Sequence, residues 1–393
     1  TVTAQGNQDD NGKGDFYYEP PSGFLALCED NLSTPEIKLP GDNFETVIWS
    51  GDDSTSRSLT VGLTPDFAWA KRRNEAQANW LFDTVRGDGL KLQSDSAGLE
   101  VSIVSDGNGI AFADNGVTIG STNSAYNEVI NESGGTYVGR FWKAGGAPTA
   151  DNSAGVGATP TAGSVKINGA NLGSALAGSI AATRISANTT SGFSIVAYTG
   201  NYAVGATVAH GLSVAPELIL VKNLDATDDW RVGSSKGIDF TDYLVLNSGA
   251  AAVDADVWND AAPTSSVFTL SNYGPNNGSG EDLIAYCFHS VEGYSKVGSY
   301  TGNSSSDGTF VYTGFTPAMV FVKNIDAATN WIQHDYKRPG YNLHDLSLRP
   351  DGSGAAESNN EVDLLSNGFK WRGDGYPSWD QASNQSGEEY LFY

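Results

Sequence analysis

Short apolar runs separated by polar turns recur along the whole chain. The runs span about four to seven residues, as at 218–221, 243–246, 267–270 and 283–288. Glycine, asparagine, aspartate or proline interrupts them at intervals of roughly 8–15 residues, which is typical of strands in an all-β sandwich. No stretch shows an amphipathic helical pattern longer than two turns. The pattern therefore predicts an all-β protein built from antiparallel, jelly-roll-like sandwiches.

Three similar short sequences, IWSGD, AYTGN and SYTGN, begin at Ile48, Ala197 and Ser299. Each introduces the same ordered frame of a glycine, a large apolar residue, a proline, an apolar run, a lysine, a polar turn and a tryptophan. The frame residues are Pro65, Pro216 and Pro317, then Lys71, Lys222 and Lys323, then Trp80, Trp230 and Trp331. Each unit closes with a glycine-led aromatic segment, and this shared order indicates three related repeats.

The repeats predict structural roles for the residues that recur. The glycine and asparagine of each turn tolerate the positive φ angles that tight turns demand. The runs FAWAK, LILVK and MVFVK are predicted to be central strands buried on both faces, each preceded by its proline. The lysine is expected to mark where each strand leaves the core. Trp49, Tyr198 and Tyr300 are expected to bury their rings at the sandwich edges.

The recurring tryptophans allow two interpretations. An exposed indole can stack on a sugar ring, whereas a buried indole anchors a domain core through its large area. Recurrence in every repeat favours core anchors, so Trp230 and Trp331 are predicted to be buried. A ligand site is expected instead in loops that differ between the repeats.

The repeats divide the chain into five segments. Residues 1–43 are interpreted as an N-terminal arm or the remnant of an upstream sandwich domain. Residues 44–143, 193–297 and 298–393 are predicted to be sandwich repeats A, B and C. Residues 144–192 are rich in Gly, Ala, Ser and Thr and are interpreted as a linker or extended arm.

Composition narrows the possible partners. The formal net charge is −24 and charged residues make up only 17% of the chain. Nucleic acid is an unfavourable partner because phosphate binding needs a positive field, and an anionic membrane surface is disfavoured for the same reason. No apolar run is long enough to span a membrane. Cys28 and Cys287 are too few and too far apart for a disulfide framework, and both are interpreted as buried free thiols.

The sequence predicts no catalytic, cofactor-binding or metal site and does not identify a ligand-binding site. His210, His289, His334 and His344 lack metal-ligand spacing. The segment 9–15 weakly resembles a calcium loop, but Lys13 stands where an oxygen ligand is needed, which favours a solvated turn. Acidic neighbours such as Asp228 and Asp229 point to opposite faces of a strand, which argues against a glycosidase pair.

Several segments carry a family resemblance. GKGDFYYEPPSGFLALCEDNL at 12–32 resembles the segment that follows a SPRY-type sandwich domain in structural proteins of tailed bacteriophages. GFSIVAYTGN, VAHGLSVAPELILVKN, GFTPAMVFVKN and LLSNGFKWR resemble the repeated domain of the same proteins, found especially in phages of aquatic bacteria. The resemblance implies a protein of the virion surface, assembled in the host cytoplasm, with no catalytic residues. The upstream SPRY-like domain of the family has no counterpart in this sequence.

Three functions are considered for this chain. The first is a tail or head fibre or receptor-binding component, which implies contacts with other virion proteins, a homo-oligomer (a trimer by family analogy) and a host surface glycan or protein as receptor. The second is a capsid decoration (cement) protein, tied to its neighbours by the 144–192 arm. The third is a polysaccharide depolymerase, which would need a concave site with two carboxylates. The first two readings require no enzyme activity and no cofactor.

Overall fold

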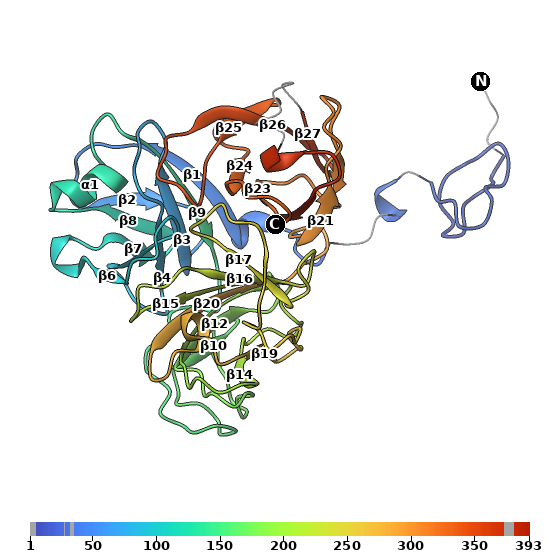
Figure 1. Ribbon diagram of the computed structural model, residues 1–393. Coiled ribbons are helices and arrows are strands. Elements are labelled where there is room, and N and C mark those ends of the chain that lie inside the picture. The colour runs from blue at the N-terminus through green and yellow to red at the C-terminus, as the bar shows by residue number, and fades with distance from the viewer. Residues whose placement is uncertain (1–4, 27, 32–34, 373–380) are drawn as a thin grey trace. The chain divides into compact units, whose positions relative to one another are not determined.

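The computed structural model describes residues 5–26, 28–31, 35–372 and 381–393. The chain forms two compact units, Thr1–Lys38 and Leu39–Tyr393. The first contains one short 3-10 helix, η1 (Glu29–Asn31). The second begins with another, η2 (Pro40–Asp42), and contains every strand and α-helix named below (Figure 1).

Repeat A is a sandwich of two antiparallel sheets with one short helix. Its inner sheet contains, in spatial order, β1 (Phe44–Ser50), β9 (Thr136–Trp142), β3 (Phe67–Arg72), β4 (Trp80–Asp83), β5 (Leu90–Gln93) and β6 (Val101–Ser102). Its outer sheet contains β2 (Arg57–Thr60), β8 (Gly116–Gly120) and β7 (Gly109–Ala113). The 3-10 helix η3 (Val104–Asp106) and helix α1 (Ser124–Ile130) lie in the connections.

Repeat B has the largest sheet of the three. Its inner sheet contains β11 (Ala170–Asn171), β10 (Val165–Ile167), β12 (Arg184–Asn188), β13 (Phe193–Thr199), β20 (Asp282–Phe288), β15 (Leu218–Asn223), β16 (Arg231–Ser234), β17 (Asp242–Val245) and β18 (Val253–Asp254). Its outer layer is β14 (Ala206–Ala209) paired with β19 (Val267–Leu270), followed along the chain by α2 (Gly274–Asn277). The β10–β12 pair is parallel, and the other strand pairs of this repeat are antiparallel.

Repeat C consists of two four-stranded sheets. Its inner sheet contains β21 (Gly298–Thr301), β28 (Glu389–Phe392), β23 (Met319–Asn324) and β24 (Ile332–Asp335). Its outer sheet contains β22 (Phe310–Tyr312), β27 (Gly368–Trp371), β26 (Glu357–Leu365) and β25 (His344–Ser347). The prediction of an all-β protein of tandem antiparallel sandwiches is confirmed.

The inner sheets share one strand order. The first strand of each repeat pairs with the closing strand, which pairs with the lysine strand, which pairs with the next strand along the chain. This order is β1-β9-β3-β4 in repeat A, β13-β20-β15-β16 in repeat B and β21-β28-β23-β24 in repeat C. Lys71, Lys222 and Lys323 also take the same register, opposite Val138, Ile284 and Leu391 of their closing strands. The three repeats are therefore structurally equivalent around these strands.

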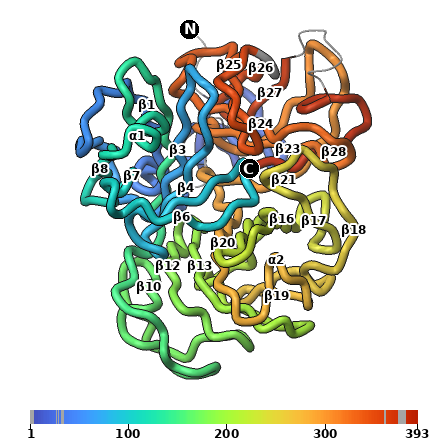
Figure 2. The backbone as a smooth tube through the Cα atoms, turned by 60° about the vertical axis from the view of Figure 1, so that its left-hand side comes forward, coloured from blue at the N-terminus to red at the C-terminus, as the bar shows by residue number. Residues whose placement is uncertain are grey.

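Four cores hold the second unit together. Each sandwich encloses one core of its own, and the backs of the three inner sheets enclose a fourth, which we call the central core. Figures 1 and 2 show the blue-to-cyan, green-to-yellow and orange-to-red repeats meeting there. Its largest members are Phe67, Trp69, Trp142, Phe193, Trp230, Tyr286, Phe288, Phe321 and Trp331. Because β3, β15 and β23 each lie between two cores, their sequences are apolar on both faces, as predicted.

The structure confirms that the aromatic ring of each recurring turn is buried, but it gives the glycine a different role from the predicted one. Trp49, Tyr198 and Tyr300 are buried, and each donates a hydrogen bond of 2.6–2.9 Å to a backbone carbonyl just before the closing strand. The positive φ angle falls one residue after the expected glycine and asparagine, at Asp53, Tyr202 and Ser304. The glycines are required for space instead. A Cβ at Gly51, Gly200 or Gly302 would collide with the backbone of the loop that precedes the closing strand of the repeat.

Residues 144–192 are not an extended arm. They include β10, β11 and β12, which extend the inner sheet of repeat B beyond β13 (Figure 2). Val165, Ile180 and Ile185 are at most 7% exposed and belong to the core of that repeat. The small residues of this segment fit tight turns against the sheet, and its few branched apolar residues are sufficient to anchor it.

Candidate functional site at the repeat junctions

The three recurring lysines join the repeats in a closed ring. They are fully buried, which corrects the expectation that they mark the exit from the core. The ammonium group of Lys222 in repeat B donates to the carbonyl of Ala97 in repeat A at 3.2 Å, and that of Lys323 in repeat C donates to Gly249 in repeat B at 3.2 Å. Lys71 in repeat A donates to Ser353 in repeat C at 2.8 Å, so the first and last repeats are joined in the same way.

A second ring of contacts follows the same direction. The indole N–H of Trp230 donates to Gln93 of repeat A at 2.9 Å, and that of Trp331 donates to Val245 of repeat B at 2.8 Å. Both tryptophans are 0% exposed, as predicted. In repeat A the corresponding residue is Asn79, whose side-chain amide donates to the carbonyls of Arg349 and Gly352 in repeat C.

Trp80 is therefore not the structural equivalent of the other two tryptophans. It pairs with Ala70, at the position that Arg231 and Ile332 occupy opposite Val221 and Val322. The turn after the lysine has the same length in all three repeats, but Trp80 stands one position later in its repeat than Trp230 and Trp331, and neighbouring strand residues point to opposite faces. Trp80 is still buried, but in the core of repeat A.

Burial changes the acid–base chemistry of the lysine ring. Desolvation lowers the pKa of Lys71, Lys222 and Lys323 to about 8 in each case, from an ordinary value of 10.5. Such a pKa could serve a catalytic amine. Here the ammonium groups of Lys222 and Lys323 each donate to three backbone carbonyls, including the last strand residue and the following turn. The lysines therefore act as buried hydrogen-bond donors that fix loops of two repeats.

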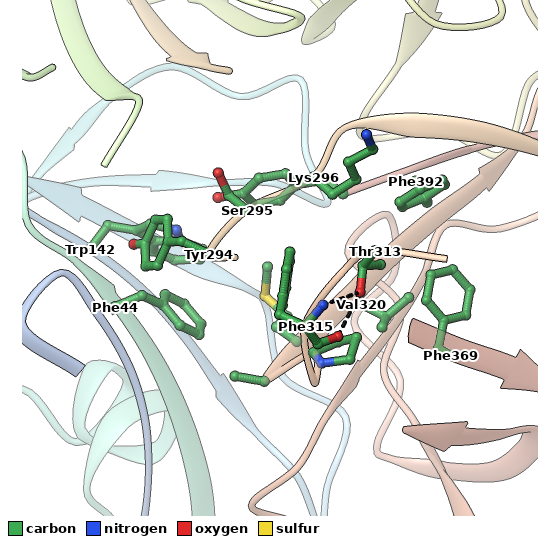
Figure 3. A pocket seen from close by; sticks show the side chains of 14 residues that line it. Phe44, Trp142, Tyr294, Ser295, Lys296, Thr313, Phe315, Val320, Phe369 and Phe392 are labelled. Carbon is green, nitrogen blue, oxygen red and sulfur yellow. Dashed lines mark hydrogen bonds between the residues drawn. The ribbon is translucent and has the colours of Figure 1, made fainter. Parts of the chain in front are cut away.

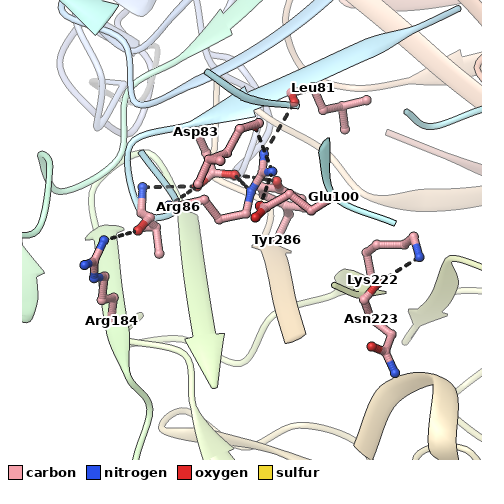
Figure 4. Close-up of polar contacts among 10 residues, drawn as sticks. Leu81, Asp83, Arg86, Glu100, Arg184, Lys222, Asn223 and Tyr286 are labelled. Atoms are coloured by element: carbon pink, nitrogen blue, oxygen red, sulfur yellow. Dashed lines mark hydrogen bonds and ion pairs between the residues drawn. The ribbon is translucent and has the colours of Figure 1, made fainter. Parts of the chain in front are cut away.

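Two junctions also contain a buried Asp-x-x-Arg ion pair. At the A–B junction, Arg86 Nε lies 2.6 Å from Asp83 Oδ2, and Arg86 Nη1 lies 2.9 Å from Glu100 (Figure 4). Tyr286 of the repeat B closing strand donates to Asp83 at 2.7 Å. Although burial opposes the positive charge, Asp83 and Glu100 raise the pKa of Arg86. Arg184 reaches the same corner and donates to the carbonyl of Val85 at 2.8 Å.

The C–A junction repeats this ion pair with a different third residue. Arg338 Nε lies 2.6 Å from Asp335 Oδ2, and Arg140 Nη2 of the repeat A closing strand lies 2.8 Å from the same oxygen. All three side chains are 0% exposed. Burial opposes the charge of Asp335, but Arg338 and Arg140 lower its pKa to about 2. Burial lowers the pKa of Arg140 to about 10.

An aromatic cavity of about 60 Å³ lies beside the C–A junction. Phe44 and Trp142 of repeat A line it together with Tyr294, Phe315 and Phe392 (Figure 3). Lys296 and Ser295 are polar residues in its lining. A cavity of this size has room for a few water molecules or a small apolar group.

A more open groove of about 390 Å³ lies on repeat C. Tyr336, Tyr341, Asn342, His344 and Leu364 contribute to its walls. Tyr341 is 79% exposed, which is unusual for so large a side chain. The loop at 336–343 supplies most of these residues and connects β24 to β25. The groove therefore combines aromatic surface with side-chain hydrogen-bonding groups.

Acidic groups that could hold a cation are occupied by protein donors. Among the described residues, Glu75, Glu128 and Glu132 are the group whose ligand atoms lie within 4.8 Å of one another. Arg72 forms ion pairs with Glu132 at 2.6 Å and Glu75 at 2.8 Å, so this cluster already surrounds a buried cation. In the first unit, both carboxylate oxygens of Asp9 accept hydrogen bonds, from the backbone and from Asn31. Asp9 thus organises the turn that resembled a calcium loop.

The structure also bears on the expectations about the cysteines and about membrane-spanning segments. Both cysteines are free thiols; Cys287 is buried, as expected, whereas Cys28 is only partly buried. Burial raises the pKa of the Cys287 thiol to about 12, which makes it unreactive. No helix in the described part of the chain is long and apolar enough to cross a membrane.

One protein family matches this chain. Residues 39–168 and 161–393 match the family model of a domain of unknown function, DUF7483. The chain belongs to the DUF7483 family. The first match begins at residue 39, where the second compact unit also begins. No curated protein matches the chain.

Two recurring signals of this DUF7483 chain escaped the sequence analysis. Asn131, Asn277 and Asn384 each begin an Asn-x-Ser-Gly sequence, and all three side chains are buried. Their backbone carbonyls accept from Asp53, Tyr202 and Ser304, the residues with positive φ in the recurring turn. The second signal is Asp-x-x-Arg at 83–86 and 335–338. The first could have been found by aligning the closing strands of the repeats, and the second by aligning their lysines.

Proposed function

We propose that this chain is a non-enzymatic structural and binding protein of a bacteriophage surface, and specifically a tail or head fibre component that contacts a receptor. The observation that supports this function is the use of the recurring polar residues. The lysines, the two equivalent tryptophans and the buried asparagines all form contacts within or between repeats. The recurring residues thus make the chain rigid, as expected of a structural component of a particle.

The groove on repeat C is our candidate for the receptor contact. Its loop at 336–343 shares the Asp-x-x-Arg turn with repeat A, but it is longer than the connections at 84–89 and 235–241 that follow the equivalent strands. Tyr336 and Tyr341 offer ring faces, and Asn342 offers amide groups, which together suit a sugar ring. The lining residues in the described part of the chain include no carboxylate, so the groove favours binding over hydrolysis of a glycan.

The first unit is the candidate attachment end. Tyr17, Tyr18 and Phe24 are 60%, 78% and 68% exposed in this small unit. Exposed aromatic side chains of this kind favour protein–protein contact. A cement protein remains the alternative, but its support from a free 144–192 arm is lost, since that segment is folded into repeat B. The first unit would have to provide the tether in that case.

Cryo-electron microscopy of intact particles that carry this chain tests the proposal. Density on the tail or at a vertex, with repeat C at the free end, would support a receptor-binding fibre. Density spread over the capsid lattice in hundreds of copies would replace the fibre with a cement protein. Purified particles that lack the chain altogether would refute both. Light scattering of the purified protein would test the expected homotrimer, which has three times the chain mass of 41.3 kDa.

A further inference from the structure

Arg140 is a fully buried cation at the C–A junction, and its side chain is 0% exposed. It lies on β9 opposite Thr46 of β1 and Trp69 of β3, facing the inner sheet of repeat C. Its Nη2 atom donates to Asp335, which also accepts from Arg338. One carboxylate therefore serves two buried guanidinium groups.

The charges of this cluster do not balance. Burial lowers the pKa of Arg73, and the charges of Arg338 and Asp335 also act on it, so a third arginine lies near this ion pair. Two other carboxylates of this region have cationic partners of their own: Asp363 pairs with Arg372, and Glu45 pairs with Lys337. The net excess of positive charge inside a protein is costly unless an anion compensates it.

Hydrogen-bond donors of the same groups are also left over. Among the described residues, Arg140 Nε and Nη1, Arg338 Nη1 and Arg73 Nε have no acceptor, although all four atoms are buried. The hydroxyl of Thr46, the cross-strand neighbour of Arg140, is buried without a partner as well. Buried polar groups are nearly always satisfied in native proteins, so this concentration of unsatisfied donors indicates a missing acceptor.

The equivalent position at the A–B junction provides an internal comparison. Tyr286 occupies on β20 the register position of Arg140 on β9, opposite Leu220 as Arg140 is opposite Trp69. It gives Asp83 a neutral hydroxyl donor, and Glu100 adds a second carboxylate to Arg86. That cluster thus has no excess cation. The excess of the C–A junction is therefore absent from the A–B junction.

We propose that the cluster of Arg140, Arg338 and Arg73 binds one small inorganic oxyanion, of the size and charge of phosphate or sulfate, between repeats A and C. Guanidinium groups suit such anions because their planar N–H donors match two oxygens at once. The anion would satisfy the donors that Asp335 does not reach and offset the excess positive charge. It would act as a structural ion that stabilises the closed ring.

Thermal unfolding of the full chain tests this site. The protein is dialysed free of phosphate and sulfate, and then titrated with potassium phosphate, potassium sulfate or potassium chloride at constant ionic strength. We expect phosphate or sulfate at 20 mM to raise the Tm by about 3 °C or more over chloride, since a ligand of the native state stabilises it. Equal effects of all three salts would overturn the proposal.

Variants separate the site from general salt effects. Arg140→Tyr introduces the side chain found at the equivalent place in repeat B and should reduce the phosphate-dependent shift to less than a third. Arg372→Gln removes a partly exposed arginine of repeat C, with the same change in net charge, and should leave the shift intact. A full shift in Arg140→Tyr would contradict the proposal. If that variant does not fold, Arg73→Gln at the edge of the cluster replaces it.

Crystals grown with selenate provide an independent measurement on the unaltered protein. An anomalous selenium peak within hydrogen-bonding distance of Arg140 and Arg338 is the expected result. Water molecules alone in that place would overturn the proposal. A peak without any anion-dependent Tm shift in solution would identify an adventitious ion only, and would overturn it as well.

Discussion

Lys71 and Ser353 are 282 residues apart in sequence, yet the ammonium group of Lys71 donates a 2.8 Å hydrogen bond to the backbone carbonyl of Ser353. This contact closes a ring of three sandwiches whose other two junctions use Lys222 and Lys323 in the same manner. Each repeat therefore contributes one face to its own core and another face to the central core. Each repeat has the size of an independent domain, but it forms an interface with both of the other repeats.

A single repeat should consequently fail to fold alone. In residues 298–393 by themselves, Phe321, Trp331 and Leu391 would lose the central core and become exposed, although each is at most 4% exposed in the full chain. The loss of that apolar burial exceeds what a small domain can sustain. We expect poorly dispersed amide NMR spectra for the isolated segment and dispersed spectra for residues 39–393. A well-dispersed spectrum of the isolated segment would show that this repeat folds without the central core.

The lysine ring predicts an unusual pH dependence of stability. The pKa of Lys222 is about 8 in the folded protein against 10.5 as its ordinary value. Between these pH values the unfolded chain binds more protons than the folded chain, so the unfolding free energy rises with pH. The stability of the wild type relative to Lys222→Met should therefore increase by about 3 kcal/mol between pH 7.5 and pH 10.5.

Urea unfolding at several pH values measures this difference. Subtracting the variant removes the contribution of the buried tyrosines, which titrate in both proteins. Lys166→Met, which removes a partly buried lysine of the same repeat, controls for the loss of one positive charge. A difference that falls with increasing pH would show that Lys222 is stabilised, not penalised, in its charged form.

Much of this architecture could be predicted from sequence because it depends on local periodicity. The runs around Phe67, Leu218 and Met319 are apolar at every position, which correctly indicated strands buried on two faces. The repeat frame also gave the burial of Trp230 and Trp331. These features follow from side-chain size and alternation, which are visible along a single chain.

The remaining features depend on which strand faces which. Trp80 looked equivalent to Trp230 and Trp331, whereas the strand register places Asn79 at the junction and Trp80 one position later. Likewise, lysine after an apolar run usually indicates an exposed strand end, whereas Lys71 is buried with acceptors from its own turn, at Gln77, and from the neighbouring repeat, at Ser353. The groove on repeat C and the arginine cluster combine residues from separate segments of the chain, so no single local pattern could indicate them.

The buried asparagines should contribute strongly to stability. The side chain of Asn277 accepts hydrogen bonds from the backbone of Asn201 and Tyr202 and donates to the carbonyls of Ala203 and Ser271. Asn277→Ala leaves several buried groups without partners, so we expect a loss of about 3 kcal/mol in unfolding free energy. Chemical denaturation measures this loss. Asn201→Ala, at an exposed position, should cost less than about 1 kcal/mol, and equal costs would contradict a special role for Asn277.

The folded state of residues 144–192 can be checked by limited proteolysis. Lys166 lies in β10, and Arg184, in β12, pairs with Asp151 and donates to Val85. A protease needs an extended, accessible backbone, so trypsin should not cleave native protein after either residue. The urea-unfolded protein should be cleaved at both. Rapid cleavage after Lys166 in the native protein would restore the interpretation of this segment as an arm.

The groove on repeat C gives the most direct functional test. Tyr341 is 79% exposed, so replacing it with alanine should change the unfolding free energy by less than about 0.5 kcal/mol. If its ring stacks on a glycan, Tyr341→Ala should weaken binding to a bacterial surface polysaccharide by at least about ten-fold, which corresponds to about 1.4 kcal/mol. Tyr312→Ala is the matched control, because Tyr312 is 65% exposed on β22 and does not line the groove. Binding to a glycan array, followed by titration of the best ligand, measures both variants. Equal loss in the two variants would indicate a general surface effect, and no loss in Tyr341→Ala would exclude the groove as the receptor contact.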